Sequence, residues 1–344
     1  MRSIPTTQDF NSVLKQYALG PLSSDAEREG GASSNVNFAL DTPQGRYFCR
    51  VRGGFREKDT LLHSVLAHLT EKQFQTAPLM HTTAGGTYVQ HENRFYELFP
   101  FIQGEEFQQG NLEQFAAMGG LLAQFHQCMR DFGCPIPLES FEGFFNNYPD
   151  LHRQEDFIQY ARQEIQSKED PTELRQRLSN ALAQIRQALE QVTSNWKQIE
   201  SDLPRVFVHG DYHPGNVLFK GNEAAYACDF DFVMPAERIY DIITALVWWS
   251  WPPPESGEKA PPDASYLEAC REFLANYNVQ SIQPLTAQEM QALVPDMQRQ
   301  LLLYGSKAAN HCDDLPGMLT WVTRHLKQVE WLERYRTQFE HGFS

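Results

Sequence analysis

The sequence contains no long hydrophobic run. Its longest apolar stretch, residues 242–249, includes Thr244 and is far shorter than the ~20 residues that a helix needs to cross a bilayer. The first ten residues, MRSIPTTQDF, also lack the apolar core of about 7 to 15 residues that a secretory signal requires. These absences argue against a membrane-spanning helix and lead us to expect a cytoplasmic protein with no membrane partner.

Cysteine is scarce and irregularly spaced. The six cysteines include no CxxC pair, so their spacing offers neither a zinc-ligand pattern nor a disulfide framework. We expect buried free thiols, because free cysteine behaves as a small hydrophobic residue. The six are Cys49, Cys128, Cys134, Cys228, Cys270 and Cys312.

Basic residues are outnumbered by acidic ones. Lys and Arg total 29 against 44 Asp and Glu, which gives a net charge of −15. Such a field repels phosphate backbones, so the charge balance argues against a nucleic-acid partner and favours cationic or metal-bound partners. The hydrophobic fraction of 41% is typical of a folded globular protein, and 344 residues at about 150 per domain predict about two domains.

The first hundred residues predict a small antiparallel sheet with one long helix. Two strand-like runs, residues 35–40 and 46–52, flank a turn-rich segment and suit a hairpin. Apolar residues at helical spacing predict a helix over 58–74. Two further strands are predicted over 86–91 and 94–99, joined by a short polar turn.

Helical patterns dominate the rest of the chain. The spacing predicts helices over 112–132 and 241–249, and a helix of about seven turns over 170–199 that begins with a capping motif. We therefore predict an α+β protein with an N-terminal lobe over residues 1–101 and a larger, mostly helical lobe over residues 102–344.

The strongest chemical signal is the segment VHGDYHPGNVLF, which covers residues 208–219. His209, Asp211 and Asn216 have the spacing of the catalytic loop of phosphoryl-transfer kinases, in which the aspartate receives the hydroxyl proton of the acceptor and the asparagine holds Mg²⁺. Asp and Asn most often serve as turn and capping residues, but the joint spacing of these residues favours a catalytic function. We expect His209 to hold the loop through hydrogen bonds.

A second acidic motif, CDFDF, places Asp229 thirteen positions after Asn216. Two strand-like runs around Gly221 separate these residues and predict a hairpin. Because a hairpin returns to its starting end, Asn216 and Asp229 would project toward one point and offer the oxygen ligands that Mg²⁺ prefers. We therefore expect Asp211, Asn216 and Asp229 to form one site.

The motifs HGDYHPGN and DFDF, behind a small sheet lobe, resemble those of the aminoglycoside phosphotransferase and choline kinase family. The similarity covers essentially the whole chain, and later segments resemble the homoserine kinase type II-like and spore-coat-associated kinases. The resemblance implies a two-lobed, protein-kinase-like fold, the use of ATP and Mg²⁺, and phosphorylation of a hydroxyl on a small molecule. It also implies a catalytic Asp211, metal ligands Asn216 and Asp229, and a buried Asp241.

The same resemblance predicts a cation at the end of the strand segment Arg46-Tyr-Phe-Cys-Arg50. Arg50 falls where the family has a lysine that contacts the α and β phosphates, although a solvated strand charge explains an arginine equally simply. The helix glutamate that usually pairs with this lysine has no clear match. The predicted helix offers Asp59 and His63 instead.

Two further segments are candidates for nucleotide contacts. The small residues 30–34 would let backbone N–H groups approach phosphate, although they lack a full GxGxxG pattern. Residues 97–99 resemble the hinge of the family, where backbone groups would meet adenine. Leu218 either lines the adenine pocket or fills the core. The expected nucleotide-binding set is Ser33, Ser34, Arg50, Glu97, Leu98, Phe99 and Leu218.

Three residues are candidates for contact with the acceptor. Asp231 and Glu237 would add negative charge where the acceptor enters, although a solvated acidic surface explains them as well. Trp248 would stack on the acceptor, although an aromatic residue on a buried helix also fits the core. Negative charge favours an amine-bearing acceptor, so we expect an amino acid or amino alcohol rather than a bulky aminoglycoside.

Three functional classes stay open at this point. The first is an ATP-dependent kinase of small molecules, including the alternative of an aminoglycoside-type antibiotic kinase. The second is a catalytically silent nucleotide-binding protein, which the missing helix glutamate suggests. A protein kinase ranks lowest, because no activation segment is identifiable after Asp229. The residues leave the oligomeric state open.

Overall fold

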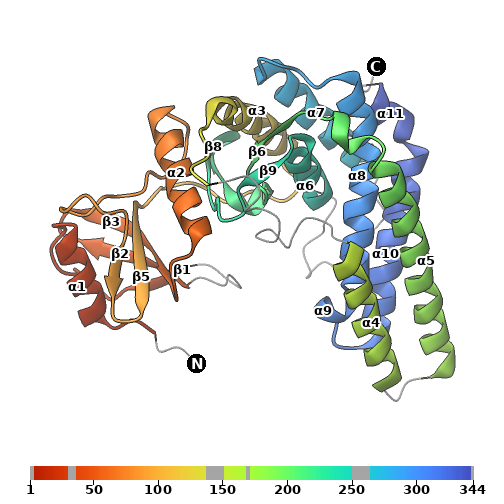
Figure 1. Ribbon diagram of the computed structural model, residues 1–344, viewed down its shortest axis with the longest axis horizontal. Coiled ribbons are helices and arrows are strands. Elements are labelled where there is room, and N and C mark those ends of the chain that lie inside the picture. The colour runs from red at the N-terminus through yellow and green to blue at the C-terminus, as the bar shows by residue number, and fades with distance from the viewer. Residues whose placement is uncertain (1–3, 30–35, 137–150, 168–170, 250–263, 342–344) are drawn as a thin grey trace.

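The computed structural model describes residues 4–29, 36–136, 151–167, 171–249 and 264–341. Figure 1 shows a sheet with a flanking helix at one end of the molecule, short strands in the middle and long helices at the other end. The α+β architecture with a small sheet lobe and a larger helical lobe, predicted from the sequence, is confirmed.

The N-terminal lobe is built on a five-stranded antiparallel sheet. Its elements are α1 (Thr7–Gln16), β1 (Glu27–Glu29), β2 (Val36–Thr42), β3 (Gly45–Arg52), α2 (Glu57–Glu71), β4 (Val89–His91) and β5 (Arg94–Pro100). The strand order is β1-β2-β3-β5-β4. Strands β2 and β3 form the predicted hairpin, in which Thr42 pairs with Gly45. The strand predicted over 86–91 begins only at Val89, since Thr82 and Gly86 bond to each other in a turn.

Alternation along β3 gives the sheet two chemically different faces. Cys49 and Val51 are buried in a core that includes Phe10 of α1. Successive side chains of a strand point to opposite faces, so Arg50 and Arg52 lie on the other face. From there both arginines reach carboxylates of the C-terminal lobe.

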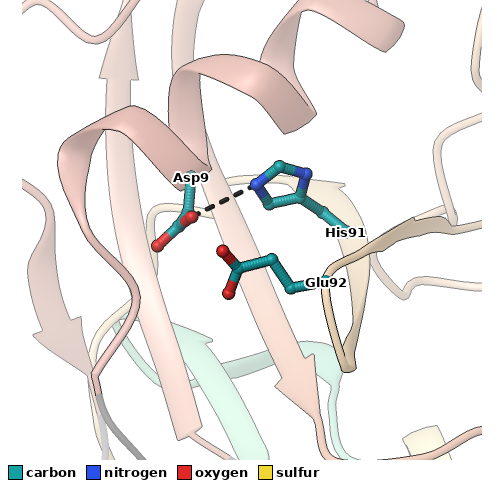
Figure 2. A group of neighbouring side chains, drawn as sticks. All are labelled: Asp9, His91 and Glu92. Carbon is teal, nitrogen blue, oxygen red and sulfur yellow. Dashed lines mark hydrogen bonds and ion pairs between the residues drawn. The ribbon is translucent and has the colours of Figure 1, made fainter.

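A contact between Asp9 and His91 connects α1 to the end of β4 (Figure 2). Oδ2 of Asp9 accepts hydrogen bonds from the backbone N–H and hydroxyl of Thr6 at 2.7 and 2.8 Å, which caps α1. Oδ1 of Asp9 lies 3.1 Å from Nε2 of His91, and Glu92 is beside them. The three side chains are close enough to hold a metal ion, but both oxygens of Asp9 already have protein partners. We therefore interpret this group as a structural clasp.

The C-terminal lobe combines two small antiparallel sheets with packed helices. Its elements are α3 (Leu112–Cys128), α4 (Leu151–Ser167), α5 (Thr172–Trp196), β6 (Arg205–Val208), β7 (Val217–Lys220), β8 (Glu223–Ala227), β9 (Met234–Glu237), α6 (Ile239–Trp249), α7 (Ala264–Gln280), α8 (Ala287–Ser306), α9 (Ala308–His311), α10 (Leu315–Arg334) and α11 (Arg336–Glu340). Strand β6 pairs with β9, and β7 pairs with β8. Among the described residues, no helix is long and apolar enough to span a membrane.

Several element boundaries differ from the sequence-based expectation. The 25 residues of α5 confirm the helix of about seven turns, while its predicted capping residue Asp170 lies outside the described residues. Helix α3 ends at Cys128, and Met129–Asp131 continue as a 3₁₀ turn. Strand β9 was not anticipated, because it is short, contains Pro235 and finds its partner in a distant segment.

Helices α3 and α7 come very close at Gly119. A Cβ atom at this position would lie 2.2 Å from the carbonyl oxygen of Phe273 and 3.2 Å from the backbone nitrogen of Tyr277. Such distances are below van der Waals contact, so the two helices pack against each other only with glycine here.

We expect Gly119→Ala to lower the free energy of unfolding by about 2 kcal/mol or more, because overpacking outweighs the gain in helix propensity. Urea denaturation measures this difference. The control is Gly120→Ala at the next position, where the new Cβ meets only the flexible side chain of Gln280. Equal losses for the two variants would contradict the close-approach argument.

A buried histidine predicts how stability depends on pH. His325 of α10 is fully buried and its Nδ1 lies 2.8 Å from the carbonyl oxygen of Trp321; burial lowers its pKa from 6.5 to about 4. Below about pH 6.5 the unfolded chain binds a proton at this histidine, whereas the folded chain binds it only near pH 4. Acidification across this window therefore favours unfolding.

Replacing His325 with Asn keeps a donor near the Nδ1 position and removes this titration. We expect the stability that is lost between pH 7 and pH 5 to be smaller in His325→Asn than in the parent by about 2 kcal/mol. Urea denaturation at the two pH values gives the comparison. Parallel losses in both proteins would show that His325 is not responsible.

Candidate active site

A buried carboxylate organises the loop that follows β6. Asp241, near the start of α6, accepts backbone N–H hydrogen bonds from His209 at 2.7 Å and from Gly210 at 2.9 Å. Its Oδ2 also lies 3.0 Å from Nε2 of His126 on α3. Asp241 has no exposed surface, and these three donors offset the cost of burying its charge. The backbone at 209–210 is therefore fixed to two helices.

Gly210 lets this loop pass directly beneath the segment that follows β8. It has a φ of 82°, and a Cβ atom here would lie 2.1 Å from the carbonyl oxygen of Phe232. Nε2 of His209, which is fully buried, donates to the carbonyl of Cys228 at 2.9 Å, in agreement with the structural use expected for it. The two loops thus form one packed unit.

Asp211 lies in this unit with its side chain 32% exposed. Nδ2 of Asn216 donates to its carbonyl oxygen at 2.9 Å and to its Oδ2 at 3.2 Å, and Nε2 of His213 lies 3.6 Å from Oδ2. Burial works against ionisation, but His213, His209 and Asn216 outweigh it, so the pKa of Asp211 falls below its usual value. The side chain is therefore an ionised proton acceptor that solvent can reach.

Asn216 and Asp229 lie at the two ends of the predicted hairpin, which the structure contains as β7 and β8. The backbone N–H of Cys228 donates to the carbonyl of Asn216 at 2.9 Å, so the two ends meet. The amide nitrogen of Asn216 is committed to Asp211, which leaves its Oδ1 as the atom able to bind a cation. Asp229 adopts a φ of 60°, and its carboxylate is 34% exposed.

Arg50 lies against the carboxylates that follow β8. Its Nη2 is 3.1 Å from Oδ1 of Asp229, and its Nη1 is 2.8 Å from Oδ1 of Asp231. Arg50 is therefore no solvated strand charge, since only 10% of its side chain is exposed. Neither Asp59 nor His63, the two helix residues considered from the sequence, is its partner.

Arg52 was missed by the sequence analysis. Its side chain is 1% exposed and forms ion pairs with Asp231 at 2.7 Å, Glu97 at 2.9 Å and Asp59 at 3.4 Å. Nε2 of His63 lies 2.6 Å from the other oxygen of Glu97. The period of two along a strand was the available signal, because Arg52 shares the face of Arg50.

The expected hinge residues have their side chains inside the N-terminal lobe. Glu97 is fully buried by Arg52 and His63, and Leu98 is fully buried in the core beneath α1. Phe99 is 7% exposed. The carbonyl of Leu98 already accepts a hydrogen bond from the backbone N–H of Met80 at 2.9 Å. A contact of this segment with adenine is therefore restricted to the remaining backbone groups.

Leu218 of β7 lies beside the connection between the lobes. A Cβ atom at Gly104 would be 2.7 Å from Cβ of Leu218, and Glu105 exchanges two backbone hydrogen bonds of 2.8 Å with Phe219. The connecting segment therefore packs directly on β7. The loop that contains Ser33 and Ser34 lies outside the described residues.

The three expected acceptor residues are not brought together. Trp248 is 37% exposed and stacks on His213 with ring centroids 4.3 Å apart, which places it beside the catalytic loop. Asp231 is occupied by the two arginines described above. Glu237 is 2% exposed and pairs with Arg205 across β6 and β9.

Comparisons with known proteins place the chain among phosphotransferases. Residues 26–279 match the Phosphotransferase enzyme family. A homoserine kinase of Methylocella silvestris is 25% identical over 248 residues, which cover 71% of this chain and 70% of that protein.

Two solved structures share the fold over almost the whole chain. An aminoglycoside phosphotransferase of Alicyclobacillus acidocaldarius has a TM-score of 0.66 at 19% identity and covers 99% of this chain and 98% of its own. A microcompartment-associated aminopropanol kinase has a TM-score of 0.63 at 16% identity, with coverage of 97% and 99%. The protein-kinase-like fold implied by the sequence motifs is thereby confirmed.

The buried carboxylate that organises the loop gives a direct test. We expect Asp241→Asn to lower the free energy of unfolding by about 2–4 kcal/mol, because the amide nitrogen would face a buried N–H donor that the carboxylate now accepts from. Urea denaturation measures the loss, and Asp202→Asn on an exposed 3₁₀ turn is the matched control. A stability equal to that of the control variant would refute the importance of this contact.

Proposed function

The chain belongs to the Phosphotransferase enzyme family, and on that premise we propose that it is an ATP-dependent kinase of amino-bearing small molecules. It transfers the γ-phosphoryl group of ATP to an acceptor hydroxyl. The observation that carries this proposal is the single unit formed by Asp211, Asn216 and Asp229, whose spacing is that of kinase catalytic loops.

Asp211 is suited to act on the acceptor hydroxyl. Its lowered pKa keeps it ionised at neutral pH, so it can accept a hydrogen bond from the hydroxyl and take up its proton as the phosphoryl group is transferred. The hydrogen bond from Asn216 holds the carboxylate in one orientation. Positioning of this kind is the main contribution of a protein to phosphoryl transfer.

The donor set at the hairpin fits a magnesium ion. Asn216 contributes an amide oxygen and Asp229 a partly exposed carboxylate, and such hard oxygen ligands are those that Mg²⁺ prefers. When bound, the ion would offset negative charge on the phosphates. We assign Asn216 and Asp229 as its protein ligands.

The candidate nucleotide residues come from both lobes. Arg50 is the strand cation nearest to Asp229, so it is our candidate for phosphate contact. Leu218 supports an adenine pocket because it adjoins the connection between the lobes. Backbone groups of residues 97–99 are the hinge candidates, and Ser33 and Ser34 stay candidates for the phosphate loop.

An amine-bearing acceptor is supported by charge and by the relatives. The similar proteins are named for homoserine and aminopropanol, both of which carry an amino group near a hydroxyl. In this chain the partly exposed Trp248 stacks on His213, which lies 3.6 Å from Asp211, and an aromatic ring near a carboxylate attracts ammonium groups. The catalytically silent alternative rested on a missing helix glutamate, and Asp231 offers Arg50 a carboxylate instead.

The proposal predicts acceptor-dependent release of ADP that needs Asp211. We expect Mg-ATP turnover with one of a set of pooled acceptors, namely homoserine, amino alcohols, sugars and aminoglycosides. Asp211→Asn should reduce the rate by about 10²–10⁴-fold, because the amide cannot take up the proton. Coupled detection of ADP measures this rate, and circular dichroism with a melting curve confirms that the variant is folded.

The possible outcomes separate the functional classes. Turnover with an aminoglycoside but no amino alcohol would favour the antibiotic kinase. Nucleotide-dependent thermal stabilisation without turnover in any pool would favour the silent binder. Turnover that survives in folded Asp211→Asn would remove the catalytic assignment of this residue.

A further inference from the structure

We propose that Asp231 is a positioning residue that holds the strand cation Arg50 in place while Asp229 binds the metal ion. This inference rests on the proposed function, because it concerns the nucleotide site of the same kinase. It reassigns Asp231 from the acceptor, where the sequence placed it, to the phosphate side of the reaction.

The contacts of Asp231 join the two lobes. Oδ1 accepts from Nη1 of Arg50 at 2.8 Å and from Nη2 of Arg52 at 2.7 Å, and Oδ2 lies 3.2 Å from Nη1 of Arg52. The exposed fractions of the three side chains are 11%, 10% and 1%, so water screens these charges poorly. A residue of the loop after β8 thus binds both Arg50 and Arg52 of β3.

Asp59 and His63, two described side chains of α2, make other contacts. Asp59 pairs with Arg52 and with the N-terminus of α2, where the backbone N–H of Arg56 donates to it at 2.7 Å. His63 is bound to Glu97 and Thr87. Among the described side chains, the ion pairs of Arg50 are therefore made with Asp229 and Asp231 of the loop after β8.

The contact between Asp231 and Arg50 affects metal binding because Arg50 has a second partner, Asp229. Arg50 also contacts Asp229, the carboxylate that we assign to the metal ion, so arginine and metal compete for one group. Asp231 gives Arg50 an anchor that does not depend on Asp229. Arg52 has Glu97 as a further close partner at 2.9 Å, so its position does not depend on Asp231 alone. With Asp231 removed, Arg50 would keep its ion pair with Asp229 and oppose metal binding there.

The test compares Asp231→Asn with Asp59→Asn. Both variants remove one carboxylate from the same ion-pair network, but Asp59 contacts Arg52 and not Arg50. We expect Asp231→Asn to raise the half-saturating Mg²⁺ concentration and the KM for ATP by about 5–20-fold, with little change in the KM for the acceptor. Asp59→Asn should lower the melting temperature and leave both constants within about twofold of the parent.

A binding measurement makes the result independent of turnover. Calorimetric titration with ADP in the presence of Mg²⁺ should show the same weakening for Asp231→Asn and none for Asp59→Asn. If the parent binds Mg-ADP but phosphorylates no acceptor, the proposed function fails while this comparison still decides the role of Asp231. Asp231→Glu keeps the charge and should recover most of the lost affinity, which also covers the case in which Asp231→Asn does not fold.

A double variant examines whether Asp231 acts through Arg50. In an Arg50→Gln background, Asp231→Asn should have no further effect on the half-saturating Mg²⁺ concentration, because the competing cation is gone. The proposal is overturned if Asp231→Asn lowers only stability or kcat, if Asp59→Asn shifts the two constants equally, or if the effects of Arg50→Gln and Asp231→Asn simply add.

Discussion

The buried carboxylate of Asp241 is the contact on which the geometry of the catalytic loop depends. It accepts two consecutive backbone N–H groups and contacts His126, so a loop without regular structure takes the rigidity of α3 and α6. His126 in turn contacts Tyr277 of α7, the helix that approaches α3 at Gly119. The placement of Asp211 is therefore a consequence of helix packing well outside the site.

The two lobes contribute to the site through different kinds of interaction. Within the C-terminal lobe, close backbone approach at Gly210 and the hairpin hydrogen bond at Asn216 hold Asp211 and Asp229 together. The N-terminal lobe reaches the same place with Arg50 and Arg52, through ion pairs. An ion pair can be exchanged for contacts with a metal ion or a phosphate without opening an apolar core, whereas the backbone packing around Gly210 cannot. The division suits a site that must admit a charged nucleotide.

The sequence predicted the parts of the site that lie close together along the chain. Asp211, Asn216 and Asp229 belong to a loop and one hairpin, so their spacing was enough to bring them together. The nucleotide and acceptor residues were harder, because their surroundings come from distant segments. The hinge prediction concerned backbone groups of Glu97, and it gave no sign that Arg52 and His63 bury the side chain. The surroundings of Glu237 likewise depend on an unanticipated strand, which pairs it with Arg205.

Local periodicity and contiguous motifs determined the architecture, the loop that carries Asp211 and the hairpin that joins Asn216 to Asp229 from the sequence by itself. These features depend on residues that are a few positions apart, where the geometry of strand, helix and turn sets the direction of each side chain. Only the tertiary structure decided which carboxylate forms an ion pair with which arginine. Arg50 and Asp231 are 181 positions apart, and their ion pair depends on distance and burial that arise when the two lobes pack together.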